Sequence, residues 1–275
     1  MNKIFTKFQN KLRDYSIYSA LNTIWIWIKH YIFQKRHTFQ LQKFNFPKNL
    51  DIRHDIQKKY TFKGVLLDIF VENKSNIIHK WHHYIPLYEK YFGNFRNRKI
   101  RFLEIGVSKG GSLQMWRKYF GHDAIIFGID INPECEKYNG LAGQVRIGSQ
   151  SDAKFLHSVV AEMGGVDIIL DDGSHRMDHI VASLRTLFPQ LNNSGIYLIE
   201  DLHTAYFSEY RGGIANKSNF FNKIRDVIDD MHHWYHEEDL KEISISGSCS
   251  AIHIHDSIVV LEKNKVYRPV HSQIS

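Results

Sequence analysis

The chain has 275 residues, enough for one α/β domain with an extension or for two small domains. Hydrophobic residues make up 43% and charged residues 24%, which excludes a wholly disordered chain and a coiled coil. Two cysteines, Cys135 and Cys249, exclude a disulfide framework and a four-cysteine zinc site. They favour a reducing compartment, so we expect a cytoplasmic protein.

The formal charge of +7 is concentrated at the N-terminus. Residues 1–60 hold 12 basic and 3 acidic residues, a net charge of +9, whereas residues 61–275 hold 24 basic and 26 acidic residues, a net charge of −2. Nucleic-acid binding through positive charge could therefore involve residues 1–60 alone, and we expect no nucleic-acid partner.

We divide the chain into a basic N-terminal helical arm with a linker, residues 1–60, and a second domain, residues 61–275. The uncharged run from Tyr15 to Ile28 is too short to span a bilayer, and no small-residue cleavage site follows it. Its tryptophans and basic flanks fit a helix at the inner membrane surface, with contacts from residues 1–36. A helix packed on the domain or on a second copy of the chain fits equally, so a homo-oligomer stays open.

Apolar runs alternate with helical periodicity from Ile100 onward, which predicts a mostly parallel sheet covered on both faces. A helix is expected from Asp178 to Leu191, and the end of the chain reads as an antiparallel hairpin. The predicted strands lie at residues 100–106, 124–130, 144–147, 166–172, 195–201, 251–255 and 258–261. The fold class is therefore a doubly wound, Rossmann-like α/β domain with an N-terminal helical extension.

Ligands bind beyond the carboxyl ends of strands in such a sheet, and five acidic residues lie there. They are Glu104, Asp130, Asp172, Glu200 and Asp201. Clustered carboxylates repel one another unless cations or hydroxyl donors are present, so this edge is the expected site.

The turn after the first strand suits a nucleoside with an amino-acid tail. It runs from Glu104 through Gly106 to Ser112, where a helix begins. It lacks both the G-x-G-x-x-G pattern of dinucleotide folds and the Gly-Lys-Ser/Thr triplet of a phosphate loop. Asp130 can bind ribose hydroxyls, and Glu104 can meet an ammonium group. A tight turn without any ligand is the alternative.

The ends of the fourth and fifth strands predict a metal site. If these strands are neighbours, Asp172, Glu200 and Asp201 converge on one hard divalent cation, Mg²⁺ or a similar ion. His175, three residues after Asp172, is placed to act as a general base. The alternative has Asp172 capping a helix and the other carboxylates in solvent.

Several ordered motifs together resemble one family, the metal-dependent sugar O-methyltransferases that act on macrolide and rhamnosyl compounds. The motifs are Glu104-Ile105-Gly106-Val107, Gly110-Gly111-Ser112, Gly148-Ser149-Gln150-Ser151-Asp152, Leu170-Asp171-Asp172-Gly173-Ser174-His175 with His179, and Gly195 to His203. The resemblance covers about residues 70–262.

The resemblance implies a class I fold that binds S-adenosylmethionine and Mg²⁺ and methylates a sugar or glycoside. It implies His175 as the base, with the metal bound by Asp172, Glu200 and Asp201. It implies cofactor contacts from Glu104, Gly106, Ser112, Asp130, Gln150, Ser151 and Asp152. Aromatic residues within 203–242 are expected to form a substrate-side insert.

Three alternatives stay open. Some relatives are named cephalosporin hydroxylase, for which His175, His179 and Asp172 would hold iron. A nicotinamide-dependent sugar oxidoreductase and a non-catalytic, membrane-peripheral nucleoside-binding protein are the other two.

Overall fold

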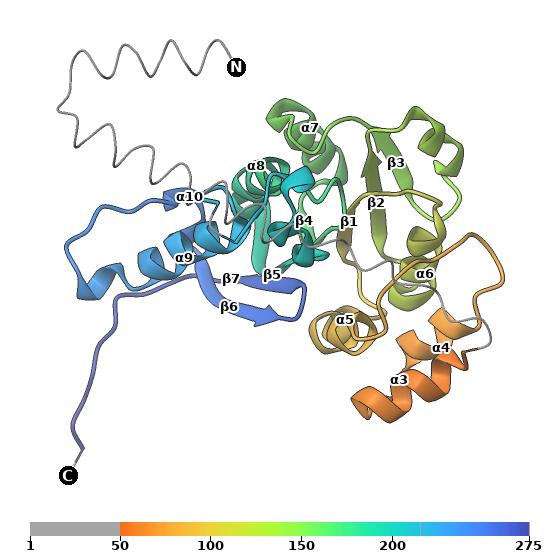
Figure 1. Ribbon diagram of the computed structural model, residues 1–275, viewed down its shortest axis with the longest axis horizontal. Coiled ribbons are helices and arrows are strands. Elements are labelled where there is room, and N and C mark those ends of the chain that lie inside the picture. Colours follow the sequence, from red (N-terminus) through yellow and green to blue (C-terminus); the bar gives the residue numbers. More distant parts are fainter. Residues whose placement is uncertain (1–49, 215, 275) are drawn as a thin grey trace, which may run out of the picture. The chain divides into compact units, whose positions relative to one another are not determined.

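The computed structural model describes residues 50–214 and 216–274, which belong to one compact unit, Pro47–Ser275. The N-terminal arm and its predicted membrane contact lie outside the described residues. Seven strands form one sheet in the order β3-β2-β1-β4-β5-β7-β6 (Figure 1). The strands are β1 (Arg101–Ile105), β2 (Ile125–Asp130), β3 (Gln144–Ile147), β4 (Val166–Asp171), β5 (Leu191–Ile199), β6 (Cys249–His255) and β7 (Ile258–Lys263).

The strand pairing confirms the predicted topology. The first five strands are parallel, whereas β7 pairs antiparallel with β5 and with β6, as expected of a C-terminal hairpin. Ile105 pairs with both Ile129 and Asp171, and Asp171 pairs with Ile199. This register brings the ends of β1, β2, β4 and β5 to one edge of the sheet.

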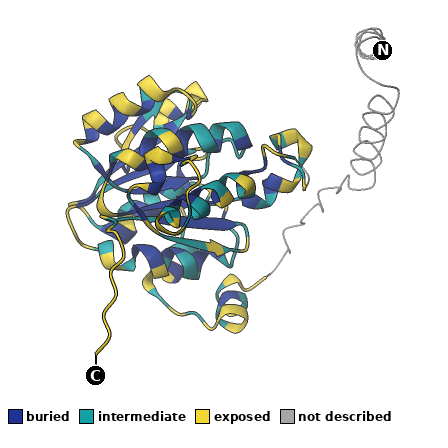
Figure 2. Ribbon diagram, turned by 90° about the vertical axis from the view of Figure 1, so that its left-hand side faces the viewer, coloured by how far each residue is buried: buried dark blue, intermediate teal, exposed yellow. Residues whose placement is uncertain are grey.

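Helices cover both faces of the sheet, as the continuous apolar strands predict. They are α3 (Ile52–Tyr60), α4 (Val65–Val71), α5 (Tyr84–Phe92), α6 (Gly111–Phe120), α7 (Ala153–Met163), α8 (Met177–Leu187), α9 (Phe220–Met231) and α10 (Ile243–Ser246). Alternate strand residues pack into two separate hydrophobic cores, one on each face of the sheet, because successive side chains of a strand point to opposite faces. Phe102 packs with α4, α5 and α6, whereas Leu103 packs with α7, α8 and α9. Figure 2 shows the strands buried between helices whose outer faces are exposed.

Two segments differ from the sequence analysis. Residues 52–60 form helix α3, capped by Asp51, instead of a linker. The helix expected to end at Leu191 ends at Leu187, and a 3-10 turn containing Pro189 follows. Pro189 has no N–H to donate to the helix ladder and its ring crowds the preceding turn, so the helix stops before it and Leu191 begins β5 instead.

Within residues 50–214 and 216–274, none of the helices combines the length and the apolar character that crossing a bilayer requires.

Candidate active site

The loop after β1 can pass the loop after β4 only because it contains a glycine. Gly106 has φ +99°, and a Cβ atom on it would lie 2.1 Å from the carbonyl oxygen of Asp172. That conformation and that distance both exclude an ordinary side chain. The backbone N–H of Gly106 donates to the carbonyl of Ile129, which ties the loop to β2. The two halves of the site thus meet at Gly106.

Asp130, at the end of β2, shapes the same loop. Its Oδ2 atom accepts from the backbone N–H groups of Val107 and Ser108, at 3.0 and 2.9 Å, and its Oδ1 atom accepts from Asn132 at 2.8 Å. A carboxylate with several N–H donors is fixed in direction. Asp130 also lines the pocket described next, where the sequence analysis expects ribose hydroxyls.

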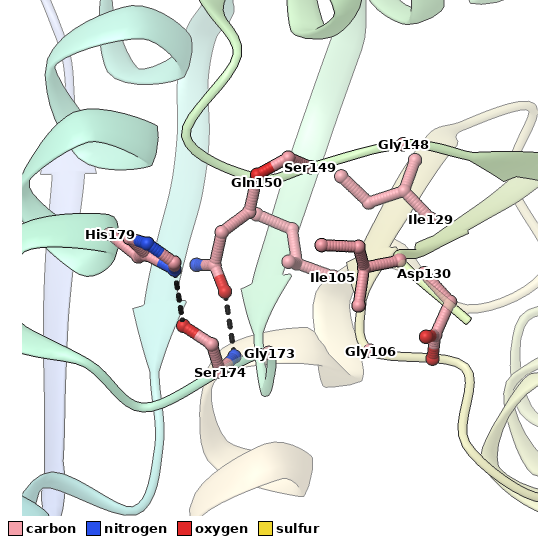
Figure 3. A pocket seen from close by; sticks show the side chains of 11 residues that line it. Ile105, Gly106, Ile129, Asp130, Gly148, Ser149, Gln150, Gly173, Ser174 and His179 are labelled. Carbon is pink, nitrogen blue, oxygen red and sulfur yellow. Dashed lines mark hydrogen bonds between the residues drawn. The ribbon is translucent and has the colours of Figure 1, made fainter. Parts of the chain in front are cut away.

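A pocket opens at this edge between β1, β2 and the segment after β4 (Figure 3). Asp130 lies at one end, and Ser174 and His179 lie at the other. Its lining is Ile105, Gly106, Ile129, Asp130, Ile131, Gly148, Ser149, Gln150, Gly173, Ser174 and His179. Apolar walls with a few placed polar groups are the usual composition of a small-molecule site. Three predicted cofactor residues, Gly106, Asp130 and Gln150, are part of it.

Gln150 fixes the segment that follows β4. Its Oε1 atom accepts from the backbone N–H of Ser174 at 2.6 Å, and its Nε2 atom donates to Asp171 at 3.1 Å. The next two residues, Ser151 and Asp152, are exposed, and their side chains bond to residues close to them in the chain. Ser151 Oγ lies 2.9 Å from Ser149 Oγ, and Asp152 caps α7 by accepting from Lys154 and Phe155.

Glu104 and Ser112 contact each other beneath the glycine loop. Ser112 Oγ donates to Glu104 Oε2 at 2.8 Å, and Trp116 Nε1 donates to Glu104 Oε1 at 3.2 Å. Glu104 is completely buried, and burial raises its pKa to about 7 despite the opposing charge of Lys80. In this arrangement Glu104 supports the loop from the core side.

Asp172, His175 and Asp201 come together at the ends of β4 and β5. Their potential ligand atoms all lie within 4.8 Å of one another. His175 Nε2 is 3.8 Å from Asp172 Oδ1 and 3.7 Å from Asp201 Oδ2. Two carboxylate oxygens therefore face one imidazole nitrogen, the mixture of hard oxygens and nitrogen that divalent cations accept.

The backbone is strained at two of these three residues. His175 has φ +56° and Asp201 has φ +59°, in the left-handed region that non-glycine residues rarely adopt. Thr204 supports both turns, because its hydroxyl contacts the carbonyl oxygens of His175 and Asp201 at 3.3 and 2.7 Å. Strained residues held by their surroundings are frequent at functional sites.

Glu200 lies beside this group and has other partners. Its side chain is 1% exposed, Lys80 Nζ bonds to its Oε1 atom, and Tyr88 donates to its Oε2 atom. Burial and the nearby Asp172 charge raise the pKa of Glu200. The grouped ligand atoms are thus two of the three predicted metal ligands together with the predicted base.

Sequence reasoning missed three residues that hold the acidic end of the site. Lys80 Nζ lies 2.6 Å from Asp172 Oδ2, and the charges of Asp172 and Glu200 raise the Lys80 pKa although burial by itself lowers it. Tyr84 donates to Asp201 Oδ1 at 2.7 Å, and its pKa is raised by burial and by the Asp201 charge. Tyr84 and Tyr88 match a segment of the family upstream of the first strand without indicating a role at the site, and Lys80 carries no signal in the sequence.

Aromatic rings lie near this group of residues. The His203 ring lies 5.7 Å from Trp81 and 6.1 Å from Phe207, and the His175 ring lies 6.3 Å from Tyr210. The rest of the predicted insert differs in burial. Phe220 is completely buried in the core, whereas Tyr235 is 72% exposed.

Comparisons with known proteins agree on one family. Residues 103–202 match the methyltransferase domain family. A tetracenomycin-C rhamnosyl 3'-O-methyltransferase of Streptomyces olivaceus is 38% identical over 201 residues, 67% of this chain and 50% of that protein. Demethylmacrocin O-methyltransferase of Streptomyces fradiae is 35% identical over 173 residues, 58% of this chain and 43% of that protein. The chain spans about half the length of the curated relatives that it matches.

A solved structure agrees with these sequence matches. The MycE methyltransferase of the mycinamycin pathway, in complex with Mg and SAH, has a TM-score of 0.66 and 28% identity, covering 74% of this chain and 55% of that chain. Neither the hydroxylase, the oxidoreductase nor the non-catalytic interpretation finds support in these comparisons. In the part of the chain that the structure describes, moreover, the ligand grouping includes Asp201 and not the His179 that the iron site would need.

Proposed function

Because the chain belongs to the class I S-adenosylmethionine sugar O-methyltransferase family, we propose that it methylates a hydroxyl of a sugar or glycosylated acceptor with the help of Mg²⁺. One observation carries the proposal. Gly173 and Ser174 line the nucleoside-sized pocket, and the residues on either side of them in the chain, Asp172 and His175, belong to the acidic group. A methyl donor in the pocket would thus lie next to the base.

The lining of the pocket suits the parts of S-adenosylmethionine. Ile131, 72% exposed at the pocket, offers apolar surface to an adenine ring. Asp130 offers carboxylate oxygens to ribose hydroxyls, and Gly106 allows the cofactor to approach the backbone closely. When bound, the cofactor supplies a methyl group on a sulfonium, which leaves as the neutral thioether when the methyl is transferred.

Asp172 and Asp201 are the residues that would hold Mg²⁺. The donor set fits, because Asp172 Oδ1 and Asp201 Oδ2 both lie within 4 Å of the same imidazole nitrogen. A bound divalent cation lowers the pKa of a hydroxyl and fixes its direction. Glu200, the third predicted ligand, directly precedes Asp201, and its two oxygens contact Lys80 and Tyr88.

His175 would act as the general base. Its Nε2 atom faces the acidic group, so it can accept the proton of an acceptor hydroxyl as the oxygen attacks the methyl group. Positioning of the attacking oxygen in line with the methyl carbon and the sulfonium sulfur, with the base beside the hydroxyl, supplies much of the remaining acceleration.

The acceptor would bind against the aromatic residues Trp81, His203, Phe207 and Tyr210. The Tyr210 ring lies beside His175, the Trp81 and Phe207 rings lie beside His203, and aromatic faces suit the apolar faces of sugars. Membrane contact through residues 1–36 and a homo-oligomer are further parts of the proposal, for which the described residues offer no test.

The test is transfer of a labelled methyl group from S-adenosylmethionine to a panel of rhamnosides and other deoxyhexosides. We expect transfer that stops on addition of EDTA and resumes with excess Mg²⁺. Equal transfer in the presence of the chelator would contradict the metal role. The Lys74→Met variant, changed at an exposed residue outside the site, is the control and should retain activity.

A further inference from the structure

Two arginines lie beside the candidate active site and share one carboxylate. Arg176 directly follows His175, and its Nε and Nη2 atoms donate to Oδ1 and Oδ2 of Asp178 at 3.3 and 3.0 Å. Arg211 Nη1 donates to the same Oδ2 atom at 2.8 Å. Arg211 directly follows Tyr210, whose ring lies 6.3 Å from the His175 ring. Two segments that border the proposed base therefore bring two guanidinium groups together.

We propose that Arg176 and Arg211 bind an anionic group of the acceptor, a phosphate or a carboxylate attached to the sugar that is methylated. A guanidinium group keeps its charge at physiological pH and binds both kinds of oxyanion through paired N–H donors. The inference rests on the proposed function and deepens it, since it names the chemical class of the acceptor.

The charges of this cluster leave an excess of one positive charge. Asp178 is the carboxylate that both arginines contact, so one negative charge faces two positive charges. Among the residues that the structure describes, neither arginine forms an ion pair with a second carboxylate. The pKa of His179 is lowered by burial and further by the two arginines, against the opposing charge of Asp178. An anion bound at the arginines would balance the excess.

Both guanidinium groups keep N–H donors for a ligand. Each guanidinium has five, and the contacts with Asp178 use the Nε and Nη2 atoms of Arg176 and the Nη1 atom of Arg211. The Nε and Nη2 atoms of Arg211 thus form an edge that suits two oxygens of a phosphate or carboxylate. The side chains of Arg176 and Arg211 are 35% and 61% exposed, so a ligand can reach them.

The turn that carries Arg211 is held in place by the backbone around it. Arg211 has φ +61°, its N–H donates to the Ser208 carbonyl, and its own carbonyl accepts from Asn216 Nδ2 at 3.0 Å. A Cβ atom on Gly212, the next residue, would lie 2.3 Å from the Ala205 carbonyl oxygen, so the turn is closely packed. Non-glycine residues held in the left-handed region are frequent at functional sites.

The cluster borders the cofactor pocket as well as the base. His179 lies at the end of the pocket away from Asp130 (Figure 3), and its Nε2 atom is 4.0 Å from Asp178 Oδ2. Arg176 is the chain neighbour of His175 on the other side. A sugar whose hydroxyl meets His175 would therefore have the two arginines next to it, where a charged substituent finds its partners.

Calorimetry on the full chain, with S-adenosylhomocysteine and Mg²⁺ present, tests the proposal with two matched pairs of sugars. We pair α-L-rhamnose 1-phosphate with methyl α-L-rhamnoside, and methyl α-D-glucuronoside with methyl α-D-glucoside. We expect the charged member of at least one pair to bind about tenfold or more tightly than its neutral counterpart, because hydrogen bonds between charged groups are the strong ones. The pair that shows the difference distinguishes a phosphate from a carboxylate.

Substitutions of the two arginines assign the preference to them. Arg176→Gln and Arg211→Gln should each weaken binding of the charged sugar about tenfold more than binding of its neutral counterpart. Arg211→Lys keeps the charge but loses the planar fork, so its loss should be smaller. Arg225→Gln is the matched control and should bind as the wild type does, since Arg225 is likewise exposed and paired with one aspartate, Asp229 on α9.

Three results would overturn the proposal. The first is no preference for the charged member of either pair, which includes a lack of binding by all four sugars. The second is a preference that both glutamine variants retain. The third is an equal loss of S-adenosylhomocysteine affinity in these variants, which would assign the arginines to the carboxylate of the cofactor. Failure of the proposed function looks different, because no acceptor, charged or neutral, would then receive a methyl group even though the arginines bind the anion.

Discussion

The two halves of the candidate site are built in different ways. At the ends of β1 and β2, the contacts join residues that are close in the chain. Asp130 bonds to Val107 and Ser108, some 20 residues earlier, and Gly106 lets the loop after β1 approach the loop after β4 closely. At the ends of β4 and β5, the carboxylates are held by Lys80, Tyr84 and Tyr88, which precede them by about 90–120 residues. The half at β1 and β2, which we call the nucleoside half, is therefore a local motif. The half at β4 and β5, the acidic half, depends on how the segment before α5 packs against the sheet.

The largest expected effect is on the acidic half. His175→Ala should reduce turnover by about 10²–10⁴-fold, because the variant loses the group that accepts the hydroxyl proton. Binding of S-adenosylmethionine should stay unchanged, since the pocket lining does not include the His175 side chain. Steady-state kinetics and calorimetry on the same preparation check both parts. His157→Ala, at an exposed position on α7, is the matched control.

The next prediction concerns the nucleoside half. Gly106→Ala should cost about 3 kcal/mol or more of unfolding free energy and abolish cofactor binding, because the new Cβ would lie 2.1 Å from the Asp172 carbonyl oxygen. Gly140→Ala is the matched control. Gly140 also has a positive φ, +80°, but a Cβ there meets nothing within 4 Å, so its cost should be about 1 kcal/mol. Chemical denaturation measures both, and equal costs would contradict the close contact.

The raised pKa of the buried Glu104 carboxyl allows a prediction of how the free energy of unfolding changes with pH. Burial raises its pKa to about 7, whereas the unfolded chain has its ordinary value of 4.5. The folded state therefore keeps this proton while the unfolded state releases it, and stability falls by up to about 3 kcal/mol as pH rises from 4.5 through 7. Glu104→Gln should remove this component and be more stable than the wild type at pH 8.

Denaturation of both proteins at several pH values, with exposed Glu136→Gln as control, measures the difference. A difference between wild type and Glu104→Gln that does not change with pH would show that Glu104 keeps an ordinary pKa in the fold.

The smallest effect separates two roles of Asp152. Its carboxylate caps α7, so Asp152→Ala should cost about 1 kcal/mol of unfolding free energy, and Asp152→Ser should recover most of it. If capping is its role, the affinity for S-adenosylhomocysteine stays within about twofold of wild type, because losing a cap disturbs only the first turn. A tenfold loss in both variants would instead assign Asp152 to the cofactor, as the family resemblance implies.

The sheet could be predicted because β1, β2, β4 and β5 each contain a short apolar run that glycine or an acidic residue follows. The mostly parallel sheet with an antiparallel C-terminal hairpin is confirmed, and β4 pairs with β5, the condition on which the metal site was predicted. Leu191 was misplaced because its position satisfies both a helical spacing and a strand start, and only Pro189 favours the strand.

Partners that lie far apart in the chain could not be predicted. Periodicity brings Glu200 and Asp201 to the same strand end, but it does not show that one is buried against Lys80 while the other faces His175. That difference depends on the docking of the segment before α5, which carries no spacing signal. The sequence therefore indicated which residues lie at this edge, and the structure showed which of their atoms face one another.

The central claim is that the two halves form one reaction site, and the nuclear magnetic resonance signal of the S-methyl group of bound S-adenosylmethionine tests it directly. With Mn²⁺ bound at the acidic half, the account predicts strong paramagnetic broadening of that signal in the wild-type chain. In Asp172→Asn the broadening should disappear and the signal should be sharp. If the chain binds both the cofactor and Mn²⁺ and the methyl signal stays sharp, the two halves do not form one site and the account is contradicted.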